Sequence, residues 1–374
     1  MNWSRFLAIM IKEFRQIRRD RLTFAMMVGV PIMQLILFGF AINMDPKNLP
    51  LAVVEGDHSA FERSLVAGLQ TSGYFRIVSQ PASEAEGDRL LARGGAQFLL
   101  VVPPDFTRAL LRGDRPALLF AADATDPAAT GNALAALNAI AASALAHELR
   151  GPLAPLAQGA APLEVRVQRR YNPEGLTRYN IVPGLIGVVL TMTMVMMTSL
   201  GMTRERERGT MENLLATPAR PFEVMVGKIV PYILIGYVQV TLILIAARLL
   251  FDVPMVGSLL LLSVALIAFI AANLGIGFTF STLARNQLQA MQLTFFYFLP
   301  SILLTGFAFP FRGMPDWAQA LGEVFPLTHF LRIVRGILLK GNGWADITPE
   351  LWPILAFLGA AGALAMLRYR KTLD

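Results

Sequence analysis

The sequence predicts an α-helical polytopic membrane protein with six transmembrane helices and an inserted α/β domain. Its 374 residues are 55% hydrophobic and only 16% charged, with a mean hydropathy of +0.52, whereas soluble domains carry about 25% charged residues. A helix needs roughly 20 mostly apolar residues to cross a bilayer. Six uncharged runs are close to that length: 22–42, 179–203, 229–247, 253–284, 286–309 and 351–367.

The first expected element is a cytoplasmic amphipathic helix over residues 1–21. An apolar stripe beside many cations suits a helix lying on an anionic membrane surface, and a simple extension of the first span is the alternative. The run at 22–42 is longer than a signal-peptide core and lacks a small-residue cleavage site, so we expect an uncleaved span. The stripe consists of Trp3, Phe6, Leu7, Met10, Phe14 and Ile17.

Residues 43–177 are expected to form a soluble α/β domain on the periplasmic side, between the first two spans. Short apolar strands alternate with helices there. This stretch has 12 basic and 14 acidic residues, so the excess of positive charge lies in the rest of the chain. The expected strands are 51–56, 74–79, 96–103, 116–123 and 163–171, the expected helices are 58–71, 83–93, 105–112 and about 127–150, and a Pro/Gly linker is expected at 151–162.

Residues 178–374 are expected to form a five-helix transmembrane domain. The basic residues outside 43–177, of which the largest cluster is at 12–21, flank the spans, which indicates topology rather than nucleic-acid binding and places both termini in the cytoplasm. The outer segment 310–349 departs from this pattern, and its stretch FPLTHFLRIVRGILLKG predicts a short re-entrant or interfacial amphipathic helix. The basic residues that depart from the pattern are Arg312, Arg332, Arg335 and Lys340.

The sequence lacks several common motifs of enzyme active sites. No GxSxG, HExxH or GxxxxGK[ST] sequence occurs, so we expect no enzymatic activity and no ATP hydrolysis by a P-loop of this chain. His58, His147 and His329 lie far apart, which predicts ordinary surface or interfacial histidines and no metal site. The expected spans hold no ionisable residue, which argues against a buried proton relay.

Amide side chains are the main polar groups inside the expected spans. Such groups hydrogen-bond between neighbouring helices, and contact with a transported molecule is the second interpretation. Aromatic residues in the fifth expected span suit amphiphilic drugs and lipid-linked molecules equally. The candidate substrate path consists of Gln239, Asn273, Gln292, Phe295 and Phe296.

A dense charged segment, RERERGTMENLLATPARP (204–221), follows the second expected span. It begins as a charge-alternating helix that continues the span. Gly209 interrupts this helix, and Thr210 can cap a second short helix that ends at Pro218 and Pro221. A solvated turn needs only two or three polar residues, so this construction indicates a contact site for another protein, although a solvated membrane-flanking patch is the simpler alternative.

This segment resembles the signature of ABC-2 type exporter permeases, in the multidrug-type bacterial subgroup with a large periplasmic domain. The resemblance extends to KEFRQIRRDR (12–21), YNPEGLTRYNIVPGLIG (171–187) and FPLTHFLRIVRGILLKG (325–341), and so covers essentially the whole chain. It implies export of a drug-like or amphiphilic substrate across the bacterial inner membrane by two associated permeases, identical or paralogous. It also implies ATP and Mg bound by separate ABC ATPase subunits, no cofactor on this chain, and a periplasmic adaptor and outer-membrane channel as further partners.

The resemblance assigns segment 204–224 to coupling with the ATPase. Two other classes stay open at this point: an ion-coupled secondary transporter, and a membrane-anchored periplasmic ligand sensor, for which one or two spans would suffice. The coupling residues implied by the family are Arg204, Glu205, Arg206, Glu207, Arg208, Gly209, Thr210, Glu212, Leu214 and Pro218.

Overall fold

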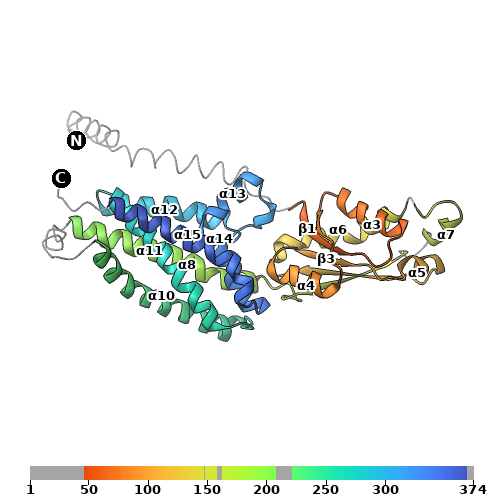
Figure 1. The fold of residues 1–374 in the computed structure, drawn as a ribbon, viewed down its shortest axis with the longest axis horizontal. Helices are drawn as coiled ribbons and strands as arrows, with labels where there is room; N and C mark the ends of the chain where they lie inside the picture. The colour runs from red at the N-terminus through yellow and green to blue at the C-terminus, as the bar shows by residue number, and fades with distance from the viewer. Residues whose placement is uncertain (1–45, 147, 158–161, 208–220, 369–374) are drawn as a thin grey trace, which may run out of the picture.

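The computed structural model describes residues 46–146, 148–157, 162–207 and 221–368. These residues form an elongated molecule in which an α/β unit stands at one end of a bundle of long helices (Figure 1). The helix expected at 1–21 and the span expected at 22–42 lie outside the described residues.

The α/β unit contains a five-stranded mixed sheet with the strand order β2-β1-β3-β4-β5. β1 is parallel to both β2 and β3, β4 is antiparallel to β3, and β5 is parallel to β4. All five strands form where the apolar segments predict them. Their bounds are β1 Leu49–Val54, β2 Phe75–Ser79, β3 Phe98–Val101, β4 Ala117–Asp123 and β5 Glu164–Arg170.

The helices of the unit begin and end at residues with clear local causes. The hydroxyls of Ser59 and Ser83 accept hydrogen bonds from backbone N–H groups in the first turns of α3 and α4. Gly94 and Gly113 end α4 and α5 in the left-handed conformation that glycine adopts without strain. The helices are α3 Ala60–Thr71, α4 Glu84–Arg93, α5 Phe106–Arg112, α6 Pro127–Leu145, the 3-10 turn η2 Gly151–Leu153 and α7 Ala154–Ala157.

The two faces of the sheet are covered by different helices. Phe75, Phe98 and Phe120 lie on one face, where α3 and α6 pack against them. Leu99 lies on the other face and packs with Leu91 of α4. α6 is long and apolar enough to cross a membrane by composition, but its buried side belongs to the core of the α/β unit. We therefore treat it as part of this unit.

The bundle contains five long helices among the described residues. Four of them, α8, α10, α11 and α15, contain stretches long and apolar enough to cross a membrane. Together with α6 of the α/β unit, they are the five described helices that meet this criterion, and α12 does not meet it. The bounds are α8 Thr177–Glu207, α10 Pro221–Phe251, α11 Leu259–Leu283, α12 Gln287–Leu304 and α15 Trp344–Arg368.

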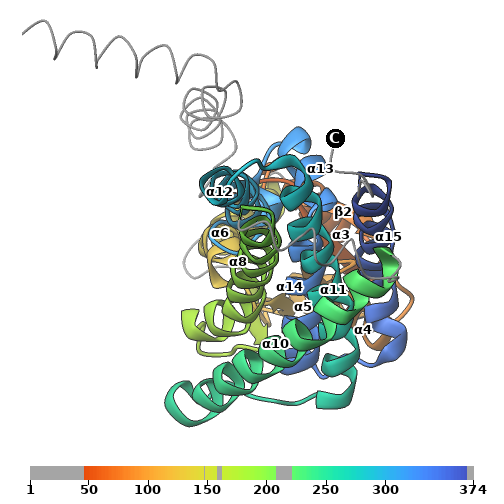
Figure 2. The same ribbon diagram turned by 90° about the vertical axis from the view of Figure 1, so that its left-hand side faces the viewer.

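α11 lies at the centre of the bundle, between α8 and α15 (Figure 2). The approach to α8 is close at Gly277, where a Cβ atom would lie 2.7 Å from the carbonyl oxygen of Val195. α10 lies at the edge and exposes large apolar side chains such as Leu242 and Leu249. This pattern is typical of a helix that faces lipid or another subunit.

The segment between α12 and α15 folds back into the bundle. It forms η3 (Phe311–Gly313), α13 (Asp316–Val324), α14 (Pro326–Arg335) and a π-helical turn, η4 (Gly336–Lys340). Pro326 occupies the first turn of α14, where proline is tolerated because the first N–H groups of a helix have no partner. Phe330 of α14 stacks on Phe269 of α11 with ring centroids 4.1 Å apart. α14 is thus packed into the bundle.

Candidate functional site

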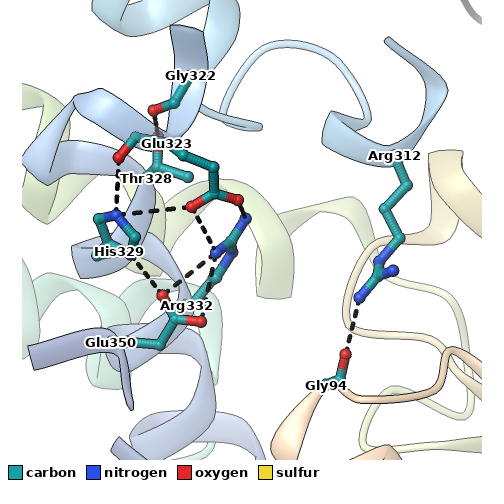
Figure 3. A network of polar contacts seen from close by, with 8 residues as sticks. All are labelled: Gly94, Arg312, Gly322, Glu323, Thr328, His329, Arg332 and Glu350. Carbon is teal, nitrogen blue, oxygen red and sulfur yellow. Dashed lines mark hydrogen bonds and ion pairs between the residues drawn. The ribbon is translucent and has the colours of Figure 1, made fainter. Parts of the chain in front are cut away.

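The α/β unit meets the bundle through the C-terminal end of α4. Three carbonyl oxygens at this end accept hydrogen bonds from the segment between α12 and α15: Leu91 from Lys340 at 3.2 Å, Ala92 from Asn342 at 3.1 Å, and Gly94 from Arg312 at 2.7 Å (Figure 3 shows the last). The last carbonyls of a helix have no partner within the helix and carry partial negative charge. Cationic and amide donors are therefore the groups expected to bind there.

Two ion pairs also cross this junction. The Nε of Arg93 lies 2.8 Å from Oδ1 of Asp346. The Nζ of Lys340 lies 2.5 Å from Oδ2 of Asp123, at the end of β4, and these two side chains are only 9% and 12% exposed. Removing one partner of such a buried pair leaves the other charge without compensation. The pairs therefore fix the α/β unit to the bundle.

A charged network around the buried His329 lies beside these contacts, between α13, α14 and α15 (Figure 3). The Nδ1 of His329 is 2.6 Å from Oε2 of Glu350, and its Nε2 is 2.9 Å from the carbonyl oxygen of Glu323. Arg332 donates to the carboxylates of both Glu323 and Glu350. The network holds the N-terminal end of α15 against α14.

The protonation of His329 follows from its neighbours. Burial by itself lowers the pKa of His329, but hydrogen bonds to Glu350 and to the Glu323 carbonyl, together with the Glu350 charge, raise it above its ordinary value. Both ring nitrogens face acceptors, which suits the imidazolium because it donates from both. The expectation that His329 is an ordinary surface or interfacial histidine is therefore wrong. In the sequence, the only signal of the network is that His329 and Arg332 are three positions apart, a spacing that places two residues on the same face of a helix.

A cavity of about 340 Å³ lies within the junction. It is bounded by the C-terminal end of α4 on one side and by η3, α13, α14 and α15 on the other. Five basic and four acidic side chains line it: Arg93, Arg312, Arg332, Arg335 and Lys340, with Asp123, Glu323, Asp346 and Glu350.

The junction explains the four basic residues of segment 310–349 that depart from the topology pattern. Arg312 and Lys340 bind the end of α4, Arg332 binds two carboxylates, and Arg335 donates to the carbonyl oxygens of Asn180 and Gly306. Their positions are set by contacts within the protein. They therefore carry no information about which side of the membrane this segment occupies.

The coupling segment is described only at its start, where α8 continues to Glu207. Glu207 accepts a hydrogen bond from the backbone N–H of Gln287 at 2.8 Å, and Arg204 donates to the Gln287 side chain at 3.4 Å. These contacts connect the end of α8 to the start of α12. Glu205 and Arg206 lie in the same last turns of α8, whereas Arg208, Gly209, Thr210, Glu212, Leu214 and Pro218 lie outside the described residues.

The candidate substrate-path residues are not brought together. Gln239 of α10 accepts a hydrogen bond from Thr193 of α8 at 3.0 Å, and Asn273 is buried and donates to the Phe269 carbonyl at 2.9 Å. Gln292, Phe295 and Phe296 lie on α12, where the two phenylalanines are 47% and 42% exposed. Gln239 thus joins two helices, and the two phenylalanines form part of an outer surface.

The other histidines do not form a site within the described part of the chain. His58 is exposed beside Glu55, and His147 lies outside the described residues. In that part of the chain no three His, Cys, Asp or Glu side chains are placed to hold a metal ion.

Comparison with known proteins gives a family for the whole chain. A family model described as ABC-2 family transporter protein matches residues 21–367. The probable multidrug ABC transporter permease YbhR of Escherichia coli (strain K12) is 28% identical over 369 residues, which cover 99% of each chain. The inner membrane transport permease YhhJ of the same strain is 30% identical over 388 residues, covering 97% of this chain and 96% of that relative. ABC transporter G family member 20 of Dictyostelium discoideum is 22% identical over 90% of this chain and 46% of its own length.

These matches span both the α/β unit and the helical bundle. Together with four apolar helices of the bundle that are long enough to cross a membrane, they lead to one conclusion. The chain belongs to the ABC-2 family of transporter proteins and is a multi-pass membrane permease.

Proposed function

We propose that this chain is the permease subunit of an ATP-driven exporter in a bacterial inner membrane, and that it moves a drug-like or amphiphilic molecule outward. The names of the relatives support this reading, since one is described as a probable multidrug permease and another as an inner membrane transport permease. The α/β unit would stand in the periplasm and both chain termini in the cytoplasm, which agrees with the basic residues that flank the spans.

The observation that carries the proposal is the continuity of α8. This helix has 31 residues and is about 46 Å long at 1.5 Å per residue, which exceeds the hydrocarbon core of about 30 Å. One end carries Glu207 and the start of the coupling segment. At the other end, Asn180 contacts Asp126 of the α/β unit and Arg335 of α14. A displacement of the coupling segment would therefore reach the junction through a single helix.

The energy for transport would come from a separate ABC ATPase that binds ATP and Mg and contacts segment 204–224. Alternating charges at such a contact give register and partner choice more than affinity. A second copy or a paralogue of the permease would complete the transporter. The α/β unit is the natural contact for a periplasmic adaptor and, through it, an outer-membrane channel.

The test is co-purification of the full chain with an ABC ATPase, followed by ATP-dependent transport in vesicles. Gly209→Pro and Glu207→Lys should leave the chain inserted and assembled but should abolish transport while ATP hydrolysis continues. Gln70→Ala on the exposed side of α3 serves as the control. Uphill transport by the purified chain without any ATPase would overturn the proposal.

An ion-coupled transporter is the second candidate, and the charged network around the buried His329, with Arg332, Glu323 and Glu350, is the observation that favours it. These groups lie near the α/β unit at the end of the bundle, and each already has a partner of opposite charge or an acceptor. A protonophore separates the two candidates. Loss of transport with ATP still present would favour ion coupling.

A further inference from the structure

Two arginines that line the junction cavity have no carboxylate partner within ion-pair distance among the described residues. The other cations of the cavity are paired: Arg93 with Asp346, Lys340 with Asp123, and Arg332 with both Glu323 and Glu350. These pairs involve all four acidic side chains of the lining. Arg312 and Arg335 therefore leave the cavity with an excess of positive charge.

Arg335 is held in place but is not fully satisfied. Its Nε donates to the carbonyl oxygen of Asn180 at 3.4 Å, and its Nη1 donates to that of Gly306 at 3.1 Å. Its Nη2 is shielded from solvent and has no hydrogen-bond partner. An unpaired buried donor on a charged group costs more than one on a neutral group, so an acceptor bound at this nitrogen would stabilise the side chain.

Arg312 offers a second set of donors to the same cavity. Its Nη2 donates to the carbonyl oxygen of Gly94 at 2.7 Å, and its other N–H groups make no hydrogen bond to the described residues. The Arg312 side chain is exposed. Burial lowers the pKa of Arg335, although the nearby Asp126 and Asp123 carboxylates act in the opposite direction, so the surroundings of Arg335 disfavour its cation. A bound anion would offset this cost, because arginine stays charged in proteins.

A second, more open cavity of about 850 Å³ lies beside the first and shares two lining residues with it. Arg312 and Gln319 line both cavities. The charged residues of the open cavity are Lys47, Arg76 and Arg312, against one acidic residue, Asp316. A cleft lined by one sign of charge raises the local concentration of ligands of the opposite sign. The second cavity thus also favours anions.

We propose that the junction cavity binds a phosphate group between Arg312 and Arg335, either as free phosphate or as the headgroup of an anionic amphiphile. Guanidinium groups present planar pairs of donors that match phosphate oxygens. The cavity volume of 340 Å³ is many times the share of about 30 Å³ that one water molecule occupies in the liquid. It therefore has room for a headgroup larger than the phosphate alone.

Phosphate binding in this cavity can be tested separately from the proposed export function, because it is measured on the permease alone. The full chain is purified in a neutral detergent, and its melting temperature is recorded with increasing inorganic phosphate. In a parallel series, phosphatidylglycerol is added in mixed micelles, with phosphatidylcholine as the zwitterionic comparison. We expect a saturable rise in melting temperature with at least one of the two anionic probes and a smaller effect of phosphatidylcholine. A response to both anionic probes indicates free phosphate as a ligand, and a response to the lipid alone indicates a headgroup site.

Three variants locate the site. Arg312→Gln should weaken binding at least about tenfold, because charge-assisted hydrogen bonds to phosphate are roughly twice as strong as neutral ones. Arg335→Lys keeps the charge but removes the paired donors and should weaken binding as well. Gln319→Glu places a carboxylate in the lining of both cavities. It should weaken anion binding by charge repulsion, although both arginines remain.

The matched control is Arg112→Gln, since Arg112 pairs with Asp114 at the end of α5 and does not line the cavity. Its affinity should equal that of the wild type. If Arg335→Lys does not fold, Arg312→Gln and Gln319→Glu still test whether the anion binds in this cavity. The proposal is overturned if neither anionic probe binds saturably, or if Arg312→Gln and Gln319→Glu bind as tightly as the wild type.

Discussion

Lys340 and Asp123 form an ion pair with their charged atoms 2.5 Å apart, although 217 positions separate them in the chain. Lys340 lies at the end of the π-helical turn after α14, and Asp123 lies at the end of β4. The aromatic ring of Tyr171 lies 5.3 Å from the same ammonium group. This pair joins the α/β unit to the helices that cross the membrane, so the two parts are expected to move together.

Breaking this ion pair should destabilise the protein. Lys340→Met leaves the Asp123 carboxylate buried without its partner, and the removal of one member of a buried pair typically costs about 3–5 kcal/mol. Thermal unfolding of the purified chain should show a clear fall in melting temperature. The double variant Asp123→Leu with Lys340→Met should recover part of the loss. An equal loss in Arg166→Gln, which breaks an exposed pair on β5, would contradict a special role for the junction.

The stability of the protein should depend on the protonation of His329. The pKa of this histidine is raised in the folded state, so its contribution to stability is fully present below its unfolded pKa of about 6.5 and is lost as the pH rises through the folded value. The charged groups around it are Glu323, Arg332 and Glu350. Melting temperature measured from pH 5 to 9 should fall on the alkaline side, and His329→Gln should flatten that part of the curve. The exposed His58→Gln is the control.

The close approach of α8 and α11 should make Gly277 intolerant of a side chain. A Cβ atom there would lie 2.7 Å from both the Val195 carbonyl oxygen and the Cβ of Thr198. Gly277→Ala must therefore separate the helices, and overpacking of this kind costs about 1–3 kcal/mol. Gly362→Ala, on α15, meets no atom within 4 Å and should be neutral or stabilising, because alanine favours a helix more than glycine does. Equal melting temperatures for the two variants would refute the packing argument.

The contact between Glu207 and Gln287 should matter for coupling and not for folding. Gln287→Ala removes the side-chain contacts that connect the start of α12 to Glu207 and Arg204. We expect a several-fold fall in ATP-dependent transport at an unchanged amount of inserted protein. The measurement is transport per assembled complex in vesicles, with Gln70→Ala as the control. A parallel fall in the melting temperature would indicate a structural role instead.

Local patterns in the sequence were sufficient to predict the positions of the helices and strands. The alternation of apolar strands with helices predicted β1–β5 and α3–α6 within a few residues, and the structure adds that Ser59 and Ser83 cap the starts of α3 and α4 while Gly94 and Gly113 end α4 and α5. Uncharged runs predicted the positions of α8, α10, α11, α12 and α15, because length and apolarity are properties of a contiguous segment. The helices extend beyond those runs, however. α10 begins at Pro221 and α15 at Trp344, because backbone hydrogen bonding continues into residues that are not apolar.

The partners of the charged groups in the bundle could not be predicted from local sequence patterns. His329 and Glu350 lie 21 positions apart, and Arg335 meets an acceptor 155 positions away. No periodicity connects such residues. The prediction of an ordinary surface or interfacial His329 rested on the absence of nearby metal-ligand spacing, and that spacing is irrelevant to a histidine held by a carboxylate and a carbonyl.

By itself, the sequence determined the class of the protein, the order of its elements and the place of the charged segment after the second expected span. These follow from hydropathy, caps and short motifs, all of which act over a few residues. Only the tertiary structure decided that α14 enters the bundle, that α4 docks on it, and that Arg312 and Arg335 share a cavity. The physical reason is that a buried charge is stabilised by whichever acceptor the fold brings near it, and that acceptor lies on another element far along the chain.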